Sequence, residues 1–192
     1  MKLLDMLKEE IRKMNVLKRA WFTSFNLNPS FVERYILPAL IGWEDVPRTV
    51  RDFESIMQII HERKMDVRFF CDNRMLELDE GKRTTIDIHP LNVNRFNGRF
   101  HDGVFHPKVI LLQDEKDRCT LFCGSANLTI GGWAHNREGV VCREIESREN
   151  AEKVKQFFQK IFKAYFWESF PQDFAIEVEK TEEDWRFSSP LV

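Results

Sequence analysis

The sequence predicts an α/β fold in which one mixed, largely parallel β-sheet carries helices on both faces. Strand-like apolar segments alternate along the chain with segments whose apolar residues recur at helical spacing. At 192 residues, the chain is close to the length of one domain and can bury a core of its own. Its 43% hydrophobic and 31% charged residues are typical of an ordinary globular protein.

The first elements alternate between helix and strand. Apolar residues at helical spacing predict a helix over 2–14, and the run "RAWFTSF" predicts a strand over 19–25. Asn28 or Ser30 can cap the following helix, and Pro38 inside that helix should kink or shorten it.

The middle of the chain continues the same pattern. Residues 50–63 predict a helix, and strands are expected over 65–71 and 83–88. The segment 91–103 is rich in Asn and Gly, so we expect it to form a loop.

The second half of the chain is richer in strands. Strands are expected over about 104–112, 119–123 and 138–144, and a helix over 149–167 closes the domain. The apolar face of this helix is wide, so it can cover a sheet or also include a subunit contact.

The folded domain is expected to span residues 1–170. The remaining residues, 171–192, are acidic and predict a C-terminal tail or linker, with a short strand around 174–178.

Charge and cysteine usage indicate a cytoplasmic protein. The N-terminus alternates charges and lacks the apolar core of a signal peptide, and no stretch approaches the roughly 18 apolar residues of a membrane span. The four cysteines form no C-x-x-C pair and suit small core positions better than a metal site. The net charge of −2 does not by itself indicate a nucleic-acid partner, although a local basic surface is still allowed.

The chemically informative stretch begins with His106 and Lys108. Residues two apart in a strand project from the same face, and Pro107 between them cannot donate a ladder hydrogen bond, which places the pair near a strand start, an edge or a bulge. An ammonium beside an imidazole suits an anionic substrate, since lysine binds phosphate oxygens and histidine serves as nucleophile, base or acid.

Further polar residues follow the next two strand boundaries. Ser125 and Asn127 come just after an apolar run, where their side chains can bind an oxyanion or simply cap a turn. Glu138 starts the following strand and can accept a hydrogen bond from a histidine Nδ1, which would fix the tautomer of that ring.

The loop before His106 is a candidate contact with nucleic acid. It contains Arg95, Arg99 and His101, which could follow a phosphate backbone, with Phe96 or Phe100 stacking on a base. A plain solvated loop is the alternative interpretation.

Together these motifs resemble the signature of the phospholipase D superfamily. H-x-K at 106–108, G-S-x-N at 124–127 and N-x-E at 136–138 occur here in the order of that signature. The segment "AWFTSFNLNPSFVERYILPALIG" also looks like the opening of bacterial phospholipase D-like proteins. The resemblance implies that residues 1–170 form a single phospholipase D-like lobe, which is the catalytic domain.

One position departs from the family pattern. The superfamily has an Asp five residues after the Lys, where this chain has Gln113, with Asp114 one step away. The tyrosyl-DNA phosphodiesterase branch also lacks this Asp, so the departure favours a DNA-processing member without excluding catalysis.

The resemblance implies phosphodiester chemistry through a covalent phosphohistidine, with no metal and no cofactor. It assigns catalytic roles to His106, Lys108, Asn127 and Glu138, and it assigns phosphate binding to Lys108, Ser125 and Asn127.

The family site uses two lobes, and each lobe supplies one H-x-K. This chain has one such motif, since no other histidine has a lysine at the second following position. Two copies can form a C2 homodimer with the site on the axis, which we favour, or the second half-site lies elsewhere. The wide apolar face of the last helix is a candidate interface.

We therefore expect a homodimeric DNA nuclease. The first alternative is a silent or half-site lobe that binds nucleic acid in a larger restriction or repair complex, with a helicase or ATPase as its partner. The second is a phospholipase or phosphatidyl transferase, for which the sequence offers neither a basic amphipathic helix nor an apolar loop that would bind a membrane.

Overall fold

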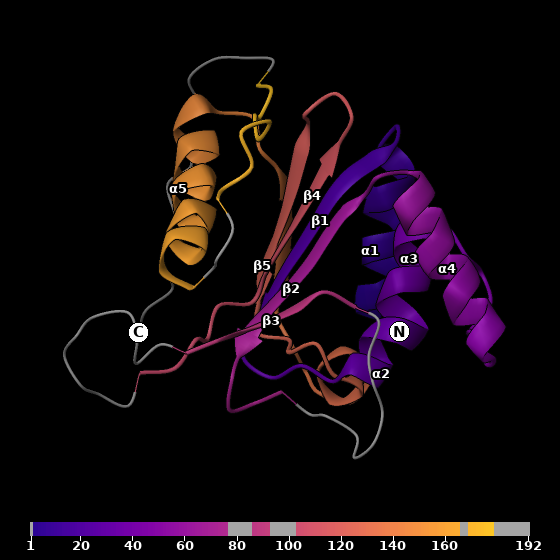
Figure 1. Cartoon of the computed structure of the whole chain (residues 1–192). Helices are drawn as coiled ribbons and strands as arrows, with labels where there is room; N and C mark the ends of the chain where they lie inside the picture. The colour runs from indigo at the N-terminus through magenta and orange to yellow at the C-terminus, as the bar shows by residue number, and fades with distance from the viewer. Residues whose placement is uncertain (1, 77–85, 93–102, 166–168, 179–192) are drawn as a thin grey trace.

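The computed structural model describes residues 2–76, 86–92, 103–165 and 169–178, and within these ranges the chain forms a six-stranded sheet. The strand order is β3-β2-β1-β4-β5-β6 (Figure 1). The strands are β1 (Leu17–Ser24), β2 (Asp66–Asp72), β3 (Ile88–Leu91), β4 (Val109–Asp114), β5 (Cys119–Gly124) and β6 (Val140–Glu144).

Helices cover both faces of the sheet, so the predicted α/β class is confirmed. Figure 1 shows α1, α3 and α4 on one face and α5 on the other. Of the helices in the described ranges, none combines the length and the apolar character needed to cross a membrane. The helical elements are α1 (Lys2–Lys13), α2 (Pro29–Phe31), the π-helical η1 (Val32–Ile36), α3 (Leu37–Ile41), α4 (Val50–Glu62), the π-helical η3 (Gly131–His135) and α5 (Arg148–Tyr165).

The sheet is mixed, as expected, but the prediction that it is largely parallel has to be corrected. β1 pairs in parallel with β2, and β2 pairs in parallel with β3. The pairs β1–β4, β4–β5 and β5–β6 are antiparallel. A parallel pair needs a long crossover, which α2 to α4 provide between β1 and β2, whereas the short turn between β4 and β5 permits only antiparallel pairing.

The start of β4 also differs from the prediction. The strand expected from about residue 104 begins at Val109. Pro107 has no backbone N–H to donate, and the N–H of Phe105 donates to the carboxylate of Asp72 instead of a neighbouring strand. His106 therefore lies just before β4 rather than inside it.

The helix after β1 is capped by Asn28, one of the two residues expected there. Its Oδ1 accepts a hydrogen bond from the N–H of Phe31 at 2.9 Å. The helical path is not broken at Pro38. Instead, the turn before it widens into η1, which relieves the clash between the proline ring and the preceding turn.

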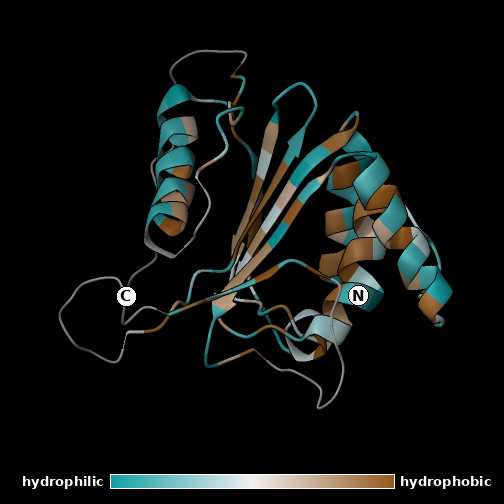
Figure 2. Cartoon of the chain, in the orientation of Figure 1, coloured by the Kyte–Doolittle hydropathy of each residue, from teal (hydrophilic) through white to brown (hydrophobic). Residues whose placement is uncertain are grey.

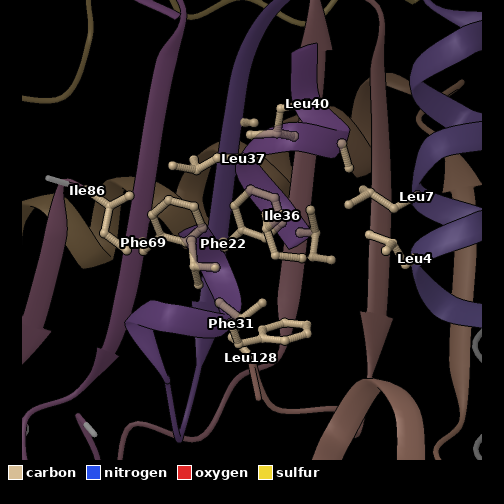
Figure 3. Close-up of a cluster of buried hydrophobic side chains, with 14 of the residues drawn as sticks. Leu4, Leu7, Phe22, Phe31, Ile36, Leu37, Leu40, Phe69, Ile86 and Leu128 are labelled. Carbon is tan, nitrogen blue, oxygen red and sulfur yellow. The ribbon is translucent and has the colours of Figure 1, made fainter. Parts of the chain in front are cut away.

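The core has two parts, one on each face of the sheet. On the side of α1, α3 and α4, Phe22 and Phe69 stack with ring centroids 4.9 Å apart, and leucine and isoleucine side chains from the helices surround them (Figure 3). On the side of α5, Trp21 lies 5.0 Å from Phe158 and 5.4 Å from Phe174 between ring centroids. Figure 2 shows the middle of the strands as mostly apolar and the turn between β4 and β5 as hydrophilic.

Phe174 belongs to the segment that the sequence assigns to a tail. Residues 171–178 are irregular, so the strand expected around 174–178 is absent from them. Phe174 is nevertheless buried against Trp21. This segment therefore contributes to the core on the α5 side.

One end of the sheet brings together the carboxyl ends of four strands and the amino ends of the other two. Because β4 and β6 run against β1, β2, β3 and β5, the carboxyl ends of the latter four meet the amino ends of β4 and β6. We call this the lower end, as in Figure 1, and the turn between β4 and β5 marks the upper end. The strand residues at the lower end are Ser24, Asp72, Leu91, Val109, Gly124 and Val140.

Candidate active site at the lower end of the sheet

His106 and Lys108 lie together at the lower end, directly before β4. The Lys108 Nζ donates to the carbonyl of His106 at 3.1 Å, and it lies 3.1 Å from Nδ1 and 3.2 Å from Nε2 of the same residue. The carbonyl of Lys108 accepts from the N–H of Gly124 at 3.1 Å, which ties this segment to the end of β5. The two side chains that the sequence predicts on one face are thus in contact.

The Lys108 ammonium makes no ion pair with a carboxylate among the described residues. Partial burial lowers its pKa from the usual lysine range, and the negative charge of Glu138 partly opposes this effect. A partly desolvated cation that has no carboxylate partner has a strong tendency to bind an anion. Lys108 is therefore suited to hold a phosphate group.

Phe25 lies against both of these residues, and sequence reasoning did not single it out. Its ring centroid is 4.9 Å from that of His106, with 45° between the ring planes, and 5.8 Å from the Lys108 Nζ. Its position in the sequence could have indicated it, because Phe25 directly follows Ser24, the last residue of β1, at the lower end of the sheet.

The side chain of Asn127 has a defined orientation. Its Oδ1 accepts from the backbone N–H of Asn26 at 3.2 Å and lies 3.4 Å from the Ser24 hydroxyl, whose proton is within closer reach of the carbonyl of Asn26. A backbone N–H can only donate, so the oxygen must face Asn26. The Nδ2 amide then has no partner within the described residues and remains available as a donor.

The backbone around Asn127 is held by close packing with Gly132. A Cβ atom at Gly132 would lie only 2.5 Å from the carbonyl oxygen of Asn127. The absence of a side chain at this position therefore allows η3 to pack against the G-S-x-N segment.

Ser125 and Glu138 interact with each other. The Ser125 hydroxyl donates to Glu138 Oε2 and accepts from the N–H of Gly139 at 3.1 Å, while Asn136 Nδ2 donates to Glu138 Oε1 at 3.2 Å. Ser125 thus uses its one proton on Glu138, and it can donate to a phosphate only by giving up this bond.

Glu138 makes no hydrogen bond to His106. The orienting role expected for Glu138 toward a histidine is therefore not fulfilled by the histidine of its own lobe.

Asp72 and Arg74 are further polar residues at the lower end that sequence reasoning missed. Asp72 is fully buried and binds Arg74 and the N–H of Phe105, one residue before His106. No motif marks these residues, because the contact joins positions 33 residues apart.

Arg95, Arg99 and His101 lie outside the described residues. Within the part of the chain that the structure describes, no group of three or more His, Cys, Asp or Glu side chains is placed to hold a metal ion.

Gln113, at the position of the family Asp, lies at the upper end of the sheet. It is buried, accepts a hydrogen bond from Arg19 Nη1, and donates through Nε2 to the carbonyl of Ala175 and to Asp117 Oδ1. A carboxylate could accept from Arg19 but could not donate to Ala175. The departure from the family pattern therefore has a structural role far from His106.

The fold and the cluster define an α/β domain with a histidine, a lysine and an asparagine amide grouped to bind an anion. Comparison with known proteins names this class. The family model described as the cardiolipin synthase, PLD-like domain matches residues 36–162, so the chain belongs to the PLD-like family, as its motifs predicted.

Several solved structures are similar to this chain at low sequence identity. NucT from Helicobacter pylori is 16% identical, with 85% of this chain and 89% of that chain covered and a TM-score of 0.51. Nuc from Salmonella typhimurium, a phospholipase D family member, is 14% identical over 83% of this chain and 86% of that chain, with a TM-score of 0.49. Yeast tyrosyl-DNA phosphodiesterase is 13% identical, with 82% of this chain and 35% of that chain covered and a TM-score of 0.44. No curated protein matches the sequence.

Proposed function

We propose that this protein is a metal-independent phosphodiesterase that cleaves DNA through a covalent phosphohistidine. The observation that carries the proposal is the cluster at the lower end of the sheet. An imidazole lies there beside an ammonium, and within the part of the chain that the structure describes this ammonium has no carboxylate partner and the Asn127 Nδ2 amide has no acceptor.

In the proposed mechanism, a histidine Nε2 attacks phosphorus and forms an N–P bond while the bond to the leaving oxygen breaks. A second histidine protonates the leaving oxygen and then takes a proton from the water that attacks the phosphohistidine, which releases the product and restores both rings. Lys108 and Asn127 bind the phosphate oxygens throughout, with Ser125 as a further donor when it releases Glu138.

The second histidine is proposed to come from a second copy of the chain in a C2 homodimer. The sequence contains one H-x-K, whereas the mechanism needs two histidines on opposite sides of phosphorus. Glu138 makes no hydrogen bond to the histidine of its own lobe, which is compatible with an orienting role toward the histidine of a second copy. We choose DNA as the substrate because the tyrosyl-DNA phosphodiesterase branch, which the sequence resembles, also lacks the Asp that is replaced by Gln113 in this chain.

The first test is cleavage of single-stranded and double-stranded DNA in excess EDTA, with His106→Ala measured beside the wild type. We expect cleavage that survives EDTA and disappears in the variant. No cleavage by the folded wild-type protein would contradict the proposed activity on DNA.

The shared site is tested with mixed dimers of wild type and His106→Asn. If each site needs a histidine from both chains, hybrid dimers are inactive, whereas independent sites would leave about half of the activity. Light scattering that shows only monomer at tens of micromolar would contradict the dimer.

A further inference from the structure

Asp72 is a buried carboxylate at the lower end of the sheet. It is the last residue of β2, and its side chain is fully buried. Arg74 binds it with both arms of the guanidinium, Nε to Oδ1 at 2.9 Å and Nη2 to Oδ2 at 2.9 Å. These hydrogen bonds are the largest of the effects on the pKa of Asp72, which is lowered to about 2. The carboxylate is therefore charged throughout the neutral range.

The Asp72–Arg74 pair also holds the segment that leads into His106. Asp72 Oδ2 accepts from the N–H of Phe105 at 2.8 Å, and Arg74 Nη2 donates to the carbonyl of Gly103 at 2.8 Å. Both bonds are assisted by charge, and such bonds are the stronger and more directional kind. The backbone before His106 is thus fixed at two points, although it belongs to no strand.

We propose that the Asp72–Arg74 pair is a positioning element for His106. The pair acts through its hydrogen bonds to the backbone of Gly103 and Phe105. This inference rests on the proposed function, because it assigns the pair to the same site. A nucleophile must stay within a few tenths of an ångström of its line of attack, and a segment outside regular structure needs anchors of this kind.

A second pair in the same molecule has the same chemistry at the opposite end. Asp114 is the last residue of β4 and is fully buried. Arg118 binds its Oδ2 through Nε at 2.9 Å and Nη2 at 2.7 Å, and its Oδ1 accepts from the N–H groups of Lys116 and Arg118. This pair closes the turn between β4 and β5, away from His106. It therefore provides a matched control for the loss of a buried, arginine-bound carboxylate.

The experiment compares Asp72→Asn with Asp114→Asn in the full chain. Asparagine keeps the size and one acceptor and removes the charge, so both variants should lose stability. We expect Asp72→Asn to lower kcat for DNA cleavage by about tenfold or more with little change in KM, and Asp114→Asn to leave kcat unchanged. Equal effects of the two variants on kcat, or no effect of Asp72→Asn, would overturn the proposal.

A second measurement does not depend on activity. The ring-proton NMR signals of His106 are assigned by their absence in His106→Gln. We expect them to shift or broaden in Asp72→Asn and to stay in place in Asp114→Asn, and unchanged signals in Asp72→Asn overturn the proposal. If the signals respond as expected but wild type does not cleave DNA, the proposed function fails while the positioning role stands.

Because Asp72 is fully buried, Arg74→Lys is measured beside it as a milder variant. A lysine keeps the positive charge but cannot bind the carboxylate with two arms and the Gly103 carbonyl at once. We expect the same NMR response in this variant, with kcat lowered in the same direction. Unaltered His106 signals in a folded Arg74→Lys protein would also count against the pair as an anchor.

Discussion

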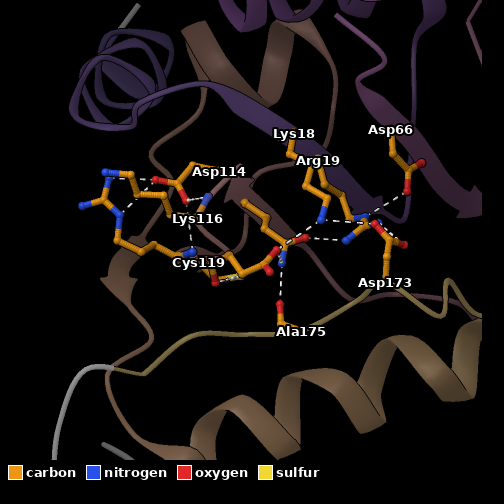
Figure 4. Close-up of polar contacts among 11 residues, drawn as sticks. Lys18, Arg19, Asp66, Asp114, Lys116, Cys119, Asp173 and Ala175 are labelled. Carbon is orange, nitrogen blue, oxygen red and sulfur yellow. Dashed lines mark hydrogen bonds and ion pairs between the residues drawn. The ribbon is translucent and has the colours of Figure 1, made fainter.

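The two ends of the β1–β4 pair each carry a cationic side chain, and the two side chains differ in whether a carboxylate pairs with them. At the upper end, the Arg19 side chain is 3% exposed and donates to Asp66 at 2.9 Å, to Asp173 at 3.2 Å and to Gln113 (Figure 4). At the lower end, the Lys108 ammonium bonds to the carbonyl of His106 and pairs with no described carboxylate. Charges that are partly removed from water are normally paired, so a partly buried lysine with no carboxylate partner among the described residues indicates a place for an anionic ligand.

The upper cluster attaches the C-terminal segment to the sheet. Asp173 pairs with both Arg19 and Lys18, and the guanidinium carbon of Arg19 lies 4.9 Å from the Trp21 ring centroid and 5.3 Å from that of Phe174. Its charged groups pair with one another within the chain, so they contribute to the structure of the domain.

The largest expected effect is the loss of stability on replacing Arg19 by Met. This change leaves the buried Gln113 oxygen and the Asp66 carboxylate without their shared donor, which we expect to cost about 3 kcal/mol or more of the free energy of unfolding. Urea denaturation measures the loss, and kcat of the remaining folded protein should stay at the wild-type value. A stability within error of wild type would show that the upper cluster does not hold the segment.

The comparison of the two ends is sharpest between Lys108→Met and Lys18→Met. Lys108→Met removes the ammonium from the site, and we expect kcat for DNA cleavage to fall by about 10²-fold to 10³-fold, the range for loss of one transition-state donor. Lys18 has ion pairs with Asp117 and Asp173, each at 3.2 Å, so Lys18→Met should leave kcat unchanged. Both variants are assayed side by side on the same substrate, and comparable rates for the two would remove the distinction between the ends.

The sequence predicted part of the group of residues that lies at the lower end. His106, Ser125, Asn127 and Glu138 all lie next to strand ends, and strand ends can be located from apolar patterns. The α/β class and most elements followed from the same patterns. The proportion of parallel strand pairs could not be predicted, because the periodicity within one segment carries no information about which segment lies beside it.

The residues that the sequence could not reveal act through distant partners. Gln113 contacts Arg19 and Ala175, which are 94 and 62 residues away along the chain. Asp72 resembles any acidic residue that ends a strand until the fold brings the N–H of Phe105 to it. Only tertiary structure separates such a residue from a solvated surface charge.

The pH dependence of cleavage tests how the lower cluster tunes its cation. Burial lowers the pKa of Lys108 and Glu138 raises it, and phosphate binding needs the charged amine. Activity should therefore fall as pH rises through a value below the usual lysine range. Glu138→Gln removes the charge that favours the protonated amine, so the alkaline limb should move to lower pH, whatever the change in maximal rate.

The matched control for this shift is Glu144→Gln, an exposed carboxylate on the same strand β6. It should leave the alkaline limb in place. A limb that moves equally in both variants would indicate a general effect of net charge rather than the local pair of Lys108 and Glu138.

The smallest expected effect concerns the aromatic support of the lower cluster. Phe25→Leu keeps an apolar side chain but removes the ring that lies 4.9 Å from the imidazole of His106. Aromatic pairs contribute about 0.5–1.5 kcal/mol beyond their buried area, so kcat should fall by roughly twofold to tenfold. Phe25→Tyr keeps the ring and should retain the wild-type rate. If the leucine variant is as fast as wild type, or the tyrosine variant is as slow as leucine, the ring does not support His106. In that case the contrast between the two ends rests on Lys108 alone.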